Sequence, residues 1–324
     1  MARNPDKAKR LTIYDVARLA NVSPGTVSRV LNNKDRVKPE TRKHVLELAR
    51  KLGLRPQVRA RRNEIAIVTE SAFRDRITGY AGAMSSHLAF ALARRNMTIL
   101  QPPDSIENLE DTFIDGIFAV TFLPPLLEML ARLEKRVPVV YIDLFENVGK
   151  RYVVRSDHEQ SGYLAARHFL TRGRKKPAFL SRNNAPSRER RDGFMRALRE
   201  AGLPIREELL LLEPEGAPVR PSIDRLVTLG ADALFVPGAS MQAVEALHYL
   251  QCGLKLRIPQ DISVIGGENE GVSESLIPPL TSIVEPAHEM AEAAADLMEK
   301  LISGNPAVQR VITLPMRLLN RVSA

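Results

Sequence analysis

The chain has 324 residues, of which 44% are hydrophobic and 26% are charged, a composition typical of globular proteins. Its single cysteine, Cys252, excludes an internal disulfide and a multi-cysteine metal site. No run approaches the ~18 apolar residues of a membrane span, and the polar, basic start does not look like a secretion signal. We therefore expect a cytoplasmic protein of two to three domains.

The charge is distributed unevenly along the chain. Residues 1–62 contain 17 Lys and Arg against 5 Asp and Glu, a net charge of +12. The remaining residues contain 30 basic and 33 acidic side chains, a net charge of −3. This asymmetry indicates that the N-terminal part alone contacts nucleic acid or an anionic membrane, with a solvated basic arm as the alternative.

Three short helices are predicted within this basic segment. Apolar residues recur at helical spacing over 13–20, and Thr12 stands three positions before an acidic residue, as in a capping box. Ser23 is a strong N-cap and Pro24 suits a first helical position, so a second helix begins there. Pro39 begins a third helix. Two helices joined by one tight turn predict a helix-turn-helix unit whose second helix enters the DNA major groove.

Four segments in this region carry a distinctive pattern, namely Thr12-Ile-Tyr-Asp-Val-Ala17, Val22-Ser23, Thr26-Val-Ser-Arg-Val-Leu-Asn32 and Thr41-Arg42. Through them, residues 11–62 resemble the DNA-binding headpiece of the LacI/GalR family of bacterial repressors. The resemblance implies that three residues face base edges: Pro24, Gly25 and Arg29. It implies that seven others contact mainly phosphates: Thr12, Tyr14, Ser23, Thr26, Ser28, Asn32 and Thr41. Packing or capping within the three helices is the alternative for Tyr14 and Thr26.

The linker after the headpiece departs from the family pattern. The family has a hinge helix whose Leu wedges into the minor groove, but Asn63 stands at the Leu position here and the linker is short. We expect four residues of the linker to enter a minor groove or contact phosphates: Arg59, Ala60, Arg61 and Arg62. Asn offers little apolar area for a wedge, so we expect a smaller operator bend.

The rest of the chain alternates strands and helices. Apolar runs predict strands at 65–68, 116–120, 137–142, 177–180, 233–236 and 263–266, and helices are expected at 81–95, 126–135, 160–170, 191–201, 241–252 and 286–302. Fully apolar strands flanked by helices indicate parallel sheets covered on both faces. Segments 114–116, 137–143, 190–194, 258–266 and 278–283 resemble the two-lobed, type I periplasmic-binding-protein-like α/β core of the same family. We thus expect a headpiece over 1–55, a hinge over 56–63 and an effector-binding, dimerising core over 64–324.

Polar residues near the carboxyl ends of these strands predict a ligand site in the cleft between the lobes. Asp143 and Glu268 follow strands, Arg190 precedes a predicted helix, Glu285 ends a strand and Phe73 lies in the first strand-to-helix loop. The resemblance implies that residues at these positions hold a sugar, and the alternative is a surface charge or a salt bridge between the lobes. The family's Asn-Asp pair is replaced by Gly238-Ala239, so we expect an atypical ligand, phosphorylated or amino-bearing, or none.

Enzyme motifs are not apparent in the sequence. The chain shows no phosphate loop or nucleophile elbow, and its six His lack metal-ligand spacing, so we expect no catalytic residue, cofactor or metal. We predict a homodimeric transcriptional repressor at the nucleoid that binds a palindromic operator and a sugar-like effector, without a membrane partner. The alternative is an effector-independent DNA-binding or architectural protein whose core only dimerises.

Overall fold

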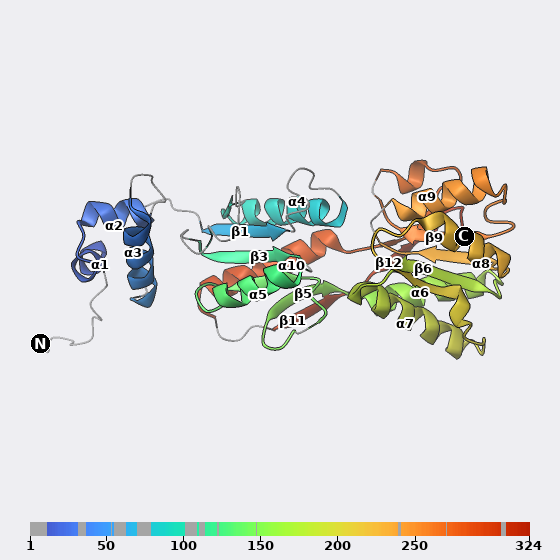
Figure 1. The fold of residues 1–324 in the computed structure, drawn as a ribbon, viewed down its shortest axis with the longest axis horizontal. Helices are drawn as coiled ribbons and strands as arrows, with labels where there is room; N and C mark the ends of the chain where they lie inside the picture. The colour runs from blue at the N-terminus through green and yellow to red at the C-terminus, as the bar shows by residue number, and fades with distance from the viewer. Residues whose placement is uncertain are drawn as a thin grey trace, which may run out of the picture. The chain divides into compact units, whose positions relative to one another are not determined.

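The computed structural model describes residues 12–31, 37–52, 54, 63–69, 79–100, 109, 114–121, 123–146, 148–238, 241–269, 271–305 and 309–324. The predicted N-terminal helices are present as α1 (Ile13–Leu19), α2 (Pro24–Leu31) and α3 (Pro39–Lys51), drawn in blue in Figure 1. They bury one apolar cluster whose members are at most 1% exposed: Val16, Val27, Val30, Leu31, Val45, Leu46 and Ala49. The headpiece therefore has its own hydrophobic core.

Two six-stranded sheets follow the headpiece (Figure 1). The first has the strand order β11-β5-β4-β3-β1-β2. Its strands are β1 (Glu64–Thr69), β2 (Thr98–Leu100), β3 (Gly116–Val120), β4 (Val139–Ile142), β5 (Tyr152–Ser156) and β11 (Val311–Leu314). The pairs β1–β2, β1–β3 and β5–β11 are parallel, as predicted. The helices α4 (Gly79–Arg94), α5 (Pro124–Leu133) and α10 (Ala287–Ile302) alternate with these strands along the chain.

The second sheet has the order β12-β10-β9-β8-β6-β7. Its strands are β6 (Pro177–Arg182), β7 (Leu210–Glu213), β8 (Ala233–Val236), β9 (Ser263–Gly267), β10 (Thr281–Val284) and β12 (Arg317–Leu319). The short β12 pairs antiparallel with β10, whereas β6–β7, β6–β8, β8–β9 and β9–β10 are parallel. The helices are α6 (His158–Thr171), α7 (Ala185–Glu200), α8 (Val219–Thr228) and α9 (Gln242–His248).

Strand β8 shows why the second sheet is covered on both faces. Ala233 and Phe235 belong to a cluster with the aromatic rings of α6, β6 and α7, while Leu234 and Val236 belong to a second cluster with α8 and α9. Because side chains alternate between the faces of a strand, an uninterrupted apolar run is buried only where helices cover both faces. The prediction of a doubly covered parallel sheet is confirmed here.

Helices α6 and α7 approach each other at the level of their backbones. A β-carbon at Gly162 would lie 1.7 Å from the carbonyl oxygen of Arg190, and one at Gly193 would lie 1.8 Å from that of Glu159. Only glycine fits at such distances. The contact fixes the backbone that carries Arg190.

Three helices differ from their predicted ranges. The helix expected at 191–201 begins at Ala185, because the Asn184 side chain accepts the N–H of Ser187 at 3.0 Å and Pro186 suits the first turn. The helix expected at 241–252 is α9 followed by a π-helical turn over Tyr249–Gly253. Helix α8 was not among the predicted helices.

The chain divides into two compact units, one comprising residues 1–72, 88–140 and 295–308 and the other 73–87, 141–294 and 309–324. The domain boundaries expected at residues 55 and 63 stay predictions, because the intervening linker lies outside the described residues up to Asn63. Within the described ranges, no helix combines the length and apolarity needed to cross a membrane.

Candidate functional site

Helix α2 separates a buried stripe from an exposed face. Val27, Val30 and Leu31 are buried, whereas Gly25 and Arg29 are exposed. The Nε of Arg29 donates to the carbonyl oxygen of Gly25 at 3.3 Å, so the guanidinium lies along the first turn of the helix. The predicted base-facing residues therefore lie on the solvent side of this helix.

The predicted phosphate-binding hydroxyls also make contacts within the headpiece. The Oγ of Ser23 accepts the N–H of Thr26 at 3.1 Å, and the two hydroxyl oxygens are 2.9 Å apart. Thr12 donates its N–H to the Asp15 carboxylate at 2.9 Å, which completes the expected capping interaction. Tyr14, by contrast, is 68% exposed, so packing inside the headpiece does not account for it.

Three other residues predicted to contact DNA, Pro24, Ser28 and Thr41, are half-buried on α2 and α3. Asn32, Arg59, Ala60, Arg61 and Arg62 lie outside the described residues, as does Phe73 of the predicted ligand site.

A cavity of about 330 Å³ lies within the second compact unit. Side chains from α4, α7, β8, β10 and their following loops line it. Most of the lining is apolar, and its apolar residues include Ala83, Phe235, Pro237, Met241, Ile283 and Met316. Its charged lining residues are Arg190, Glu268 and Glu285, three of the residues predicted from the sequence.

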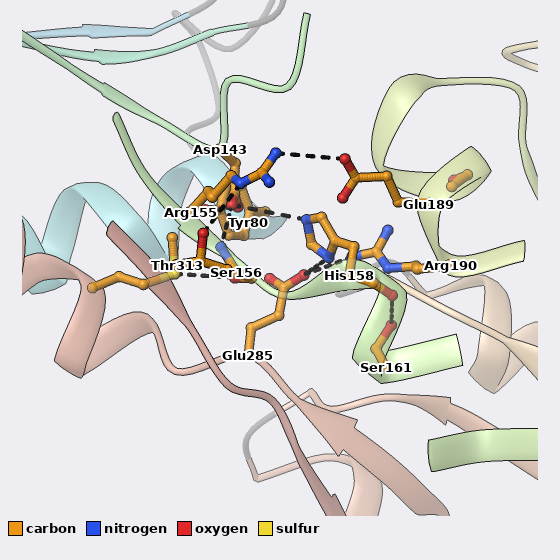
Figure 2. A network of polar contacts seen from close by, with 12 residues as sticks. Tyr80, Asp143, Arg155, Ser156, His158, Ser161, Glu189, Arg190, Glu285 and Thr313 are labelled. Atoms are coloured by element: carbon orange, nitrogen blue, oxygen red, sulfur yellow. Dashed lines mark hydrogen bonds and ion pairs between the residues drawn. The ribbon is translucent and has the colours of Figure 1, made fainter. Parts of the chain in front are cut away.

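Arg190 and Glu285 form a buried ion pair at the wall of this cavity (Figure 2). A terminal guanidinium nitrogen of Arg190 donates to Oε1 of Glu285 at 2.7 Å, and the two side chains are 9% and 16% exposed. Glu285 follows β10 directly, as expected. Arg190 lies inside α7 and does not precede the helix, because α7 begins six residues earlier than the predicted range of 191–201.

Asp143 is buried next to the cavity but is not part of its lining. Its Oδ1 accepts the N–H of Ser156 at 2.8 Å, and its Oδ2 accepts the hydroxyl of Tyr80, which does line the cavity (Figure 2). The residue has a φ of +56°, a backbone conformation that Asp tolerates better than most residues. Asp143 therefore orients Tyr80, and its direct contact with a ligand stays a prediction.

His158 lies between the two buried carboxylates. Its Nε2 is 3.8 Å from Oδ1 of Asp143, and its Nδ1 is 3.9 Å from Oε1 of Glu285. Burial, with the charges of Arg190 and Arg155, holds the pKa of His158 well below its usual value, so the ring is neutral.

Burial also raises the pKa values of the acidic groups around His158. It raises the pKa of Asp143, and it raises the pKa of Glu285 to about 7 against the opposing effect of the Arg190 charge. Burial and the charges of the two carboxylates raise the pKa of Tyr80. Near neutral pH Glu285 therefore exchanges between an ionised form and a protonated form.

Glu268 follows β9 as predicted and is held by the chain's C-terminal segment. Arg321 donates two N–H groups to its carboxylate, at 2.7 and 3.1 Å, and the Ser282 hydroxyl donates to it as well. The charge of Glu268 is thus compensated within its own compact unit, and its contact with a ligand stays a prediction.

Sequence reasoning missed Tyr80, His158 and Arg321. Arg321 is 53 residues from its partner, and Tyr80 is 63 residues from Asp143. A local sequence pattern does not predict contacts between residues this far apart in the chain. Within the described residues, no group of three or more His, Cys, Asp or Glu side chains is arranged to hold a metal ion.

Comparison with known families gives two matches. Residues 12–57 match the family described as bacterial regulatory proteins, lacI family, and residues 166–324 match a periplasmic binding protein-like domain. Together they cover the headpiece and the part of the core that carries the second sheet.

Individual relatives extend over nearly the whole chain. Catabolite control protein A of Priestia megaterium is 31% identical over 97% of this chain and 99% of its own length. The HTH-type transcriptional repressor PurR of Photobacterium profundum is 28% identical over 96% and 98%. Among solved structures, a CelR–cellobiose complex matches with a TM-score of 0.70 and 26% identity over 97% of this chain and all of the other. The Lac repressor bound to ONPG matches with a TM-score of 0.69 at 21% identity over 98% and 100%, which shows the shared fold.

Proposed function

The chain belongs to the lacI family of bacterial regulatory proteins, which are DNA-binding transcription regulators, and from this we propose that it is a repressor. It binds an approximately palindromic operator as a homodimer, and a small molecule in the cavity sets its affinity for that operator. One headpiece spans a half-site, so a two-fold dimer reads an inverted repeat.

The exposed face of α2 is the observation that carries this proposal. The helix buries Val27, Val30 and Leu31 and leaves Gly25 and Arg29 exposed, within a segment of net charge +12. Phosphate contacts supply sequence-independent affinity, and base contacts add specificity. Arg29 carries most of the specific reading, because Pro24 and Gly25 present no hydrogen-bonding side chain.

The remaining predicted DNA contacts are part of the same proposal. Thr12, Tyr14, Ser23, Thr26, Ser28, Asn32 and Thr41 bind phosphates, and the linker residues Arg59, Ala60, Arg61 and Arg62 contact the minor groove or phosphates. The headpiece comprises residues 1–55, the hinge 56–63 and the core 64–324.

The effector site is the cavity beside Arg190, Glu268 and Glu285. One solved relative that is 26% identical is a complex with cellobiose, which supports a small-molecule ligand of sugar-like size. The alternative, a core that only dimerises, gains support from Asp143 and Glu268, whose carboxylates are engaged by the chain's own donors. A thermal-shift panel separates the two functions, since a ligand that binds the folded state raises its melting temperature.

Titrations with operator and random DNA test the DNA-binding half of the proposal. Arg29→Ala should lose about 1–3 kcal/mol on operator and little on random DNA, whereas Arg61→Ala should weaken both and flatten the salt dependence. Arg172→Ala, which removes one positive charge at the end of α6, is the control and should leave both affinities unchanged. Equal losses on both DNAs for Arg29→Ala would show that α2 does not read sequence through this residue.

A further inference from the structure

Arg190 gives the cavity one edge that is rich in hydrogen-bond donors. Its side chain is 9% exposed, and its guanidinium has five N–H groups in a fixed plane. The described structure assigns one ion-pair partner to this guanidinium, Glu285, and its other N–H groups have no partner among the described residues. Because Arg190 lines the cavity, these donors are available to an acceptor on a ligand.

Carboxylate acceptors for ligand hydroxyls are few in comparison. Asp143 does not line the cavity, and the charge of Glu268 is compensated by two N–H groups of Arg321 and by the Ser282 hydroxyl. Of the lining carboxylates in the described ranges, Glu285 therefore has the most acceptor capacity left. A buried neutral sugar needs an acceptor for almost every hydroxyl, and each unpaired one costs about 1–3 kcal/mol.

The walls of the cavity are suited to an apolar body. Phe235, Ile283 and Met316 pack at its second-sheet side, and Met241 is 57% exposed beside it. Thioether side chains adapt to ring edges and aliphatic groups alike. A volume of about 330 Å³ lies at the small end of ligand pockets, so it accommodates one ring and a short substituent.

We infer that the cavity binds a compact organic anion, a monocarboxylate built on one aliphatic or aromatic ring, with its carboxylate on Arg190 and its ring against Phe235, Met241 and Met316. This inference rests on the proposed function, because it names the ligand class of the same effector site. It replaces the sugar-like ligand expected from the family resemblance.

When a ligand carboxylate binds to Arg190, Glu285 takes up a proton, and this offsets the added negative charge. Glu285 faces Arg190, Asp143, the Nδ1 of His158 at 3.9 Å, and Tyr80. Since burial already raises the pKa of Glu285 to about 7, a ligand carboxylate nearby favours the protonated form, which then donates to the ligand. Binding should therefore strengthen as the pH falls from 8 to 6.

Calorimetry with the full-length chain tests the ligand class. The probes are benzoate and cyclohexanecarboxylate, with benzamide as the neutral match of benzoate and glucose as the polyol. We expect both carboxylates to bind, and benzamide and glucose to bind at least about tenfold more weakly, because a charge-assisted hydrogen bond to arginine is lost. Failure of both carboxylates to bind, or equal affinity of benzamide and benzoate, overturns the inference.

Variants then locate the bound probe. Arg190→Gln should abolish benzoate binding, whereas Arg188→Gln, on the same helix but paired with Glu146 away from the cavity, should retain it. If Arg190→Gln unfolds, the double variant with Glu285→Gln leaves no unpaired charge, and comparing it with Glu285→Gln alone isolates the part of the loss that belongs to Arg190. Retained benzoate binding in a folded Arg190 variant contradicts the proposed site.

Operator titration in the presence of each probe separates the two proposals. Benzoate that binds through Arg190 without changing operator affinity overturns the effector role and leaves the ligand class standing. Glucose that binds more tightly than benzoate and changes operator affinity overturns the ligand class and leaves the effector role standing.

Discussion

Glu285 links the cavity to pH. Its carboxyl has a pKa raised from 4.5 to about 7, so between these values the folded state binds a proton that the unfolded state has released. The contribution of this group to the free energy of unfolding is therefore fully present below pH 4.5 and is lost as the pH rises through about 7. A shift of this size corresponds to roughly 3 kcal/mol at most.

Glu285→Gln removes this titration. We expect the stability difference between the natural chain and the variant to change in favour of the variant as the pH rises from 5 to 8. Urea unfolding at several pH values measures the free energy of unfolding of both chains. Comparing how this free energy changes with pH in each chain removes the constant cost of breaking the pair with Arg190. A stability difference that is flat across this range would show that Glu285 is already ionised in the folded chain at pH 5.

The residues of the site were predictable only where a local pattern marks them. Arg190, Glu268 and Glu285 line the cavity, and two of them were identified because they follow apolar strands. Asp143 follows a strand as well, yet the Tyr80 side chain separates it from the lining. The sequence does not show which strand-end residue a distant side chain will cover.

The contact between α6 and α7 is the element on which the Arg190 position depends. Gly162→Ala would place a methyl group 1.7 Å from the Arg190 carbonyl oxygen, so the helices must separate. We expect a loss of about 3 kcal/mol in unfolding free energy, near the upper end for overpacking, together with loss of ligand binding.

Gly202→Ala is the matched control for this prediction. Gly202 follows the C-cap of α7 with a φ of +72°, and nothing lies within 4 Å of its β-carbon position, so alanine there costs only backbone strain, about 1 kcal/mol. Denaturant titration of both variants compares the two costs. A Gly162→Ala loss no larger than the Gly202→Ala loss would mean that the helices adapt to a methyl group without strain.

Asn63 lies at the boundary between linker and core. Its carbonyl oxygen accepts the N–H of Thr98 at 2.7 Å, and the following Glu64 donates its N–H to Asp115 at 2.9 Å. These bonds hold the backbone of Asn63 next to the start of β1, and its short amide side chain offers little apolar area for a minor-groove wedge. We therefore predict a smaller operator bend than insertion of an apolar wedge produces, where kinks of ~20–90° are typical.

Fluorescence transfer between the ends of an operator duplex measures this bend. Asn63→Gly should leave the small bend unchanged, because the interactions of Asn63 with β2 are made by its backbone. A pronounced central kink that persists in Asn63→Gly would show that another residue supplies the wedge.

Helices and strands were predictable where an apolar run or a capping residue marks their position in the sequence. The apolar run of β8 predicted a strand covered on both faces, and Ser23 with Pro24 predicted the start of α2. The start of α7 was misplaced because a charged run hides the Asn184 cap. Helix α8 was overlooked although Val219, Ser222, Ile223 and Leu226 are buried at helical spacing, since proline and arginine interrupt the apolar pattern.

At the scale of the whole molecule, charge separates the two tasks of the chain. The net charge of +12 in residues 1–62 and of −3 in the remainder assigns phosphate binding to the headpiece and leaves the core mildly acidic. Phosphate neutralisation releases counterions, so operator affinity should fall steeply with salt.

Selection from a random duplex library with the full-length chain tests the central claim most directly, because it assumes no operator. We expect enrichment of a half-site that is present twice in inverted orientation, with the two copies centred about one helical turn apart. We expect Arg29→Ala to lose that enrichment. Enrichment of no sequence, or of a single half-site without its inverted copy, would contradict a dimer that reads its operator through α2.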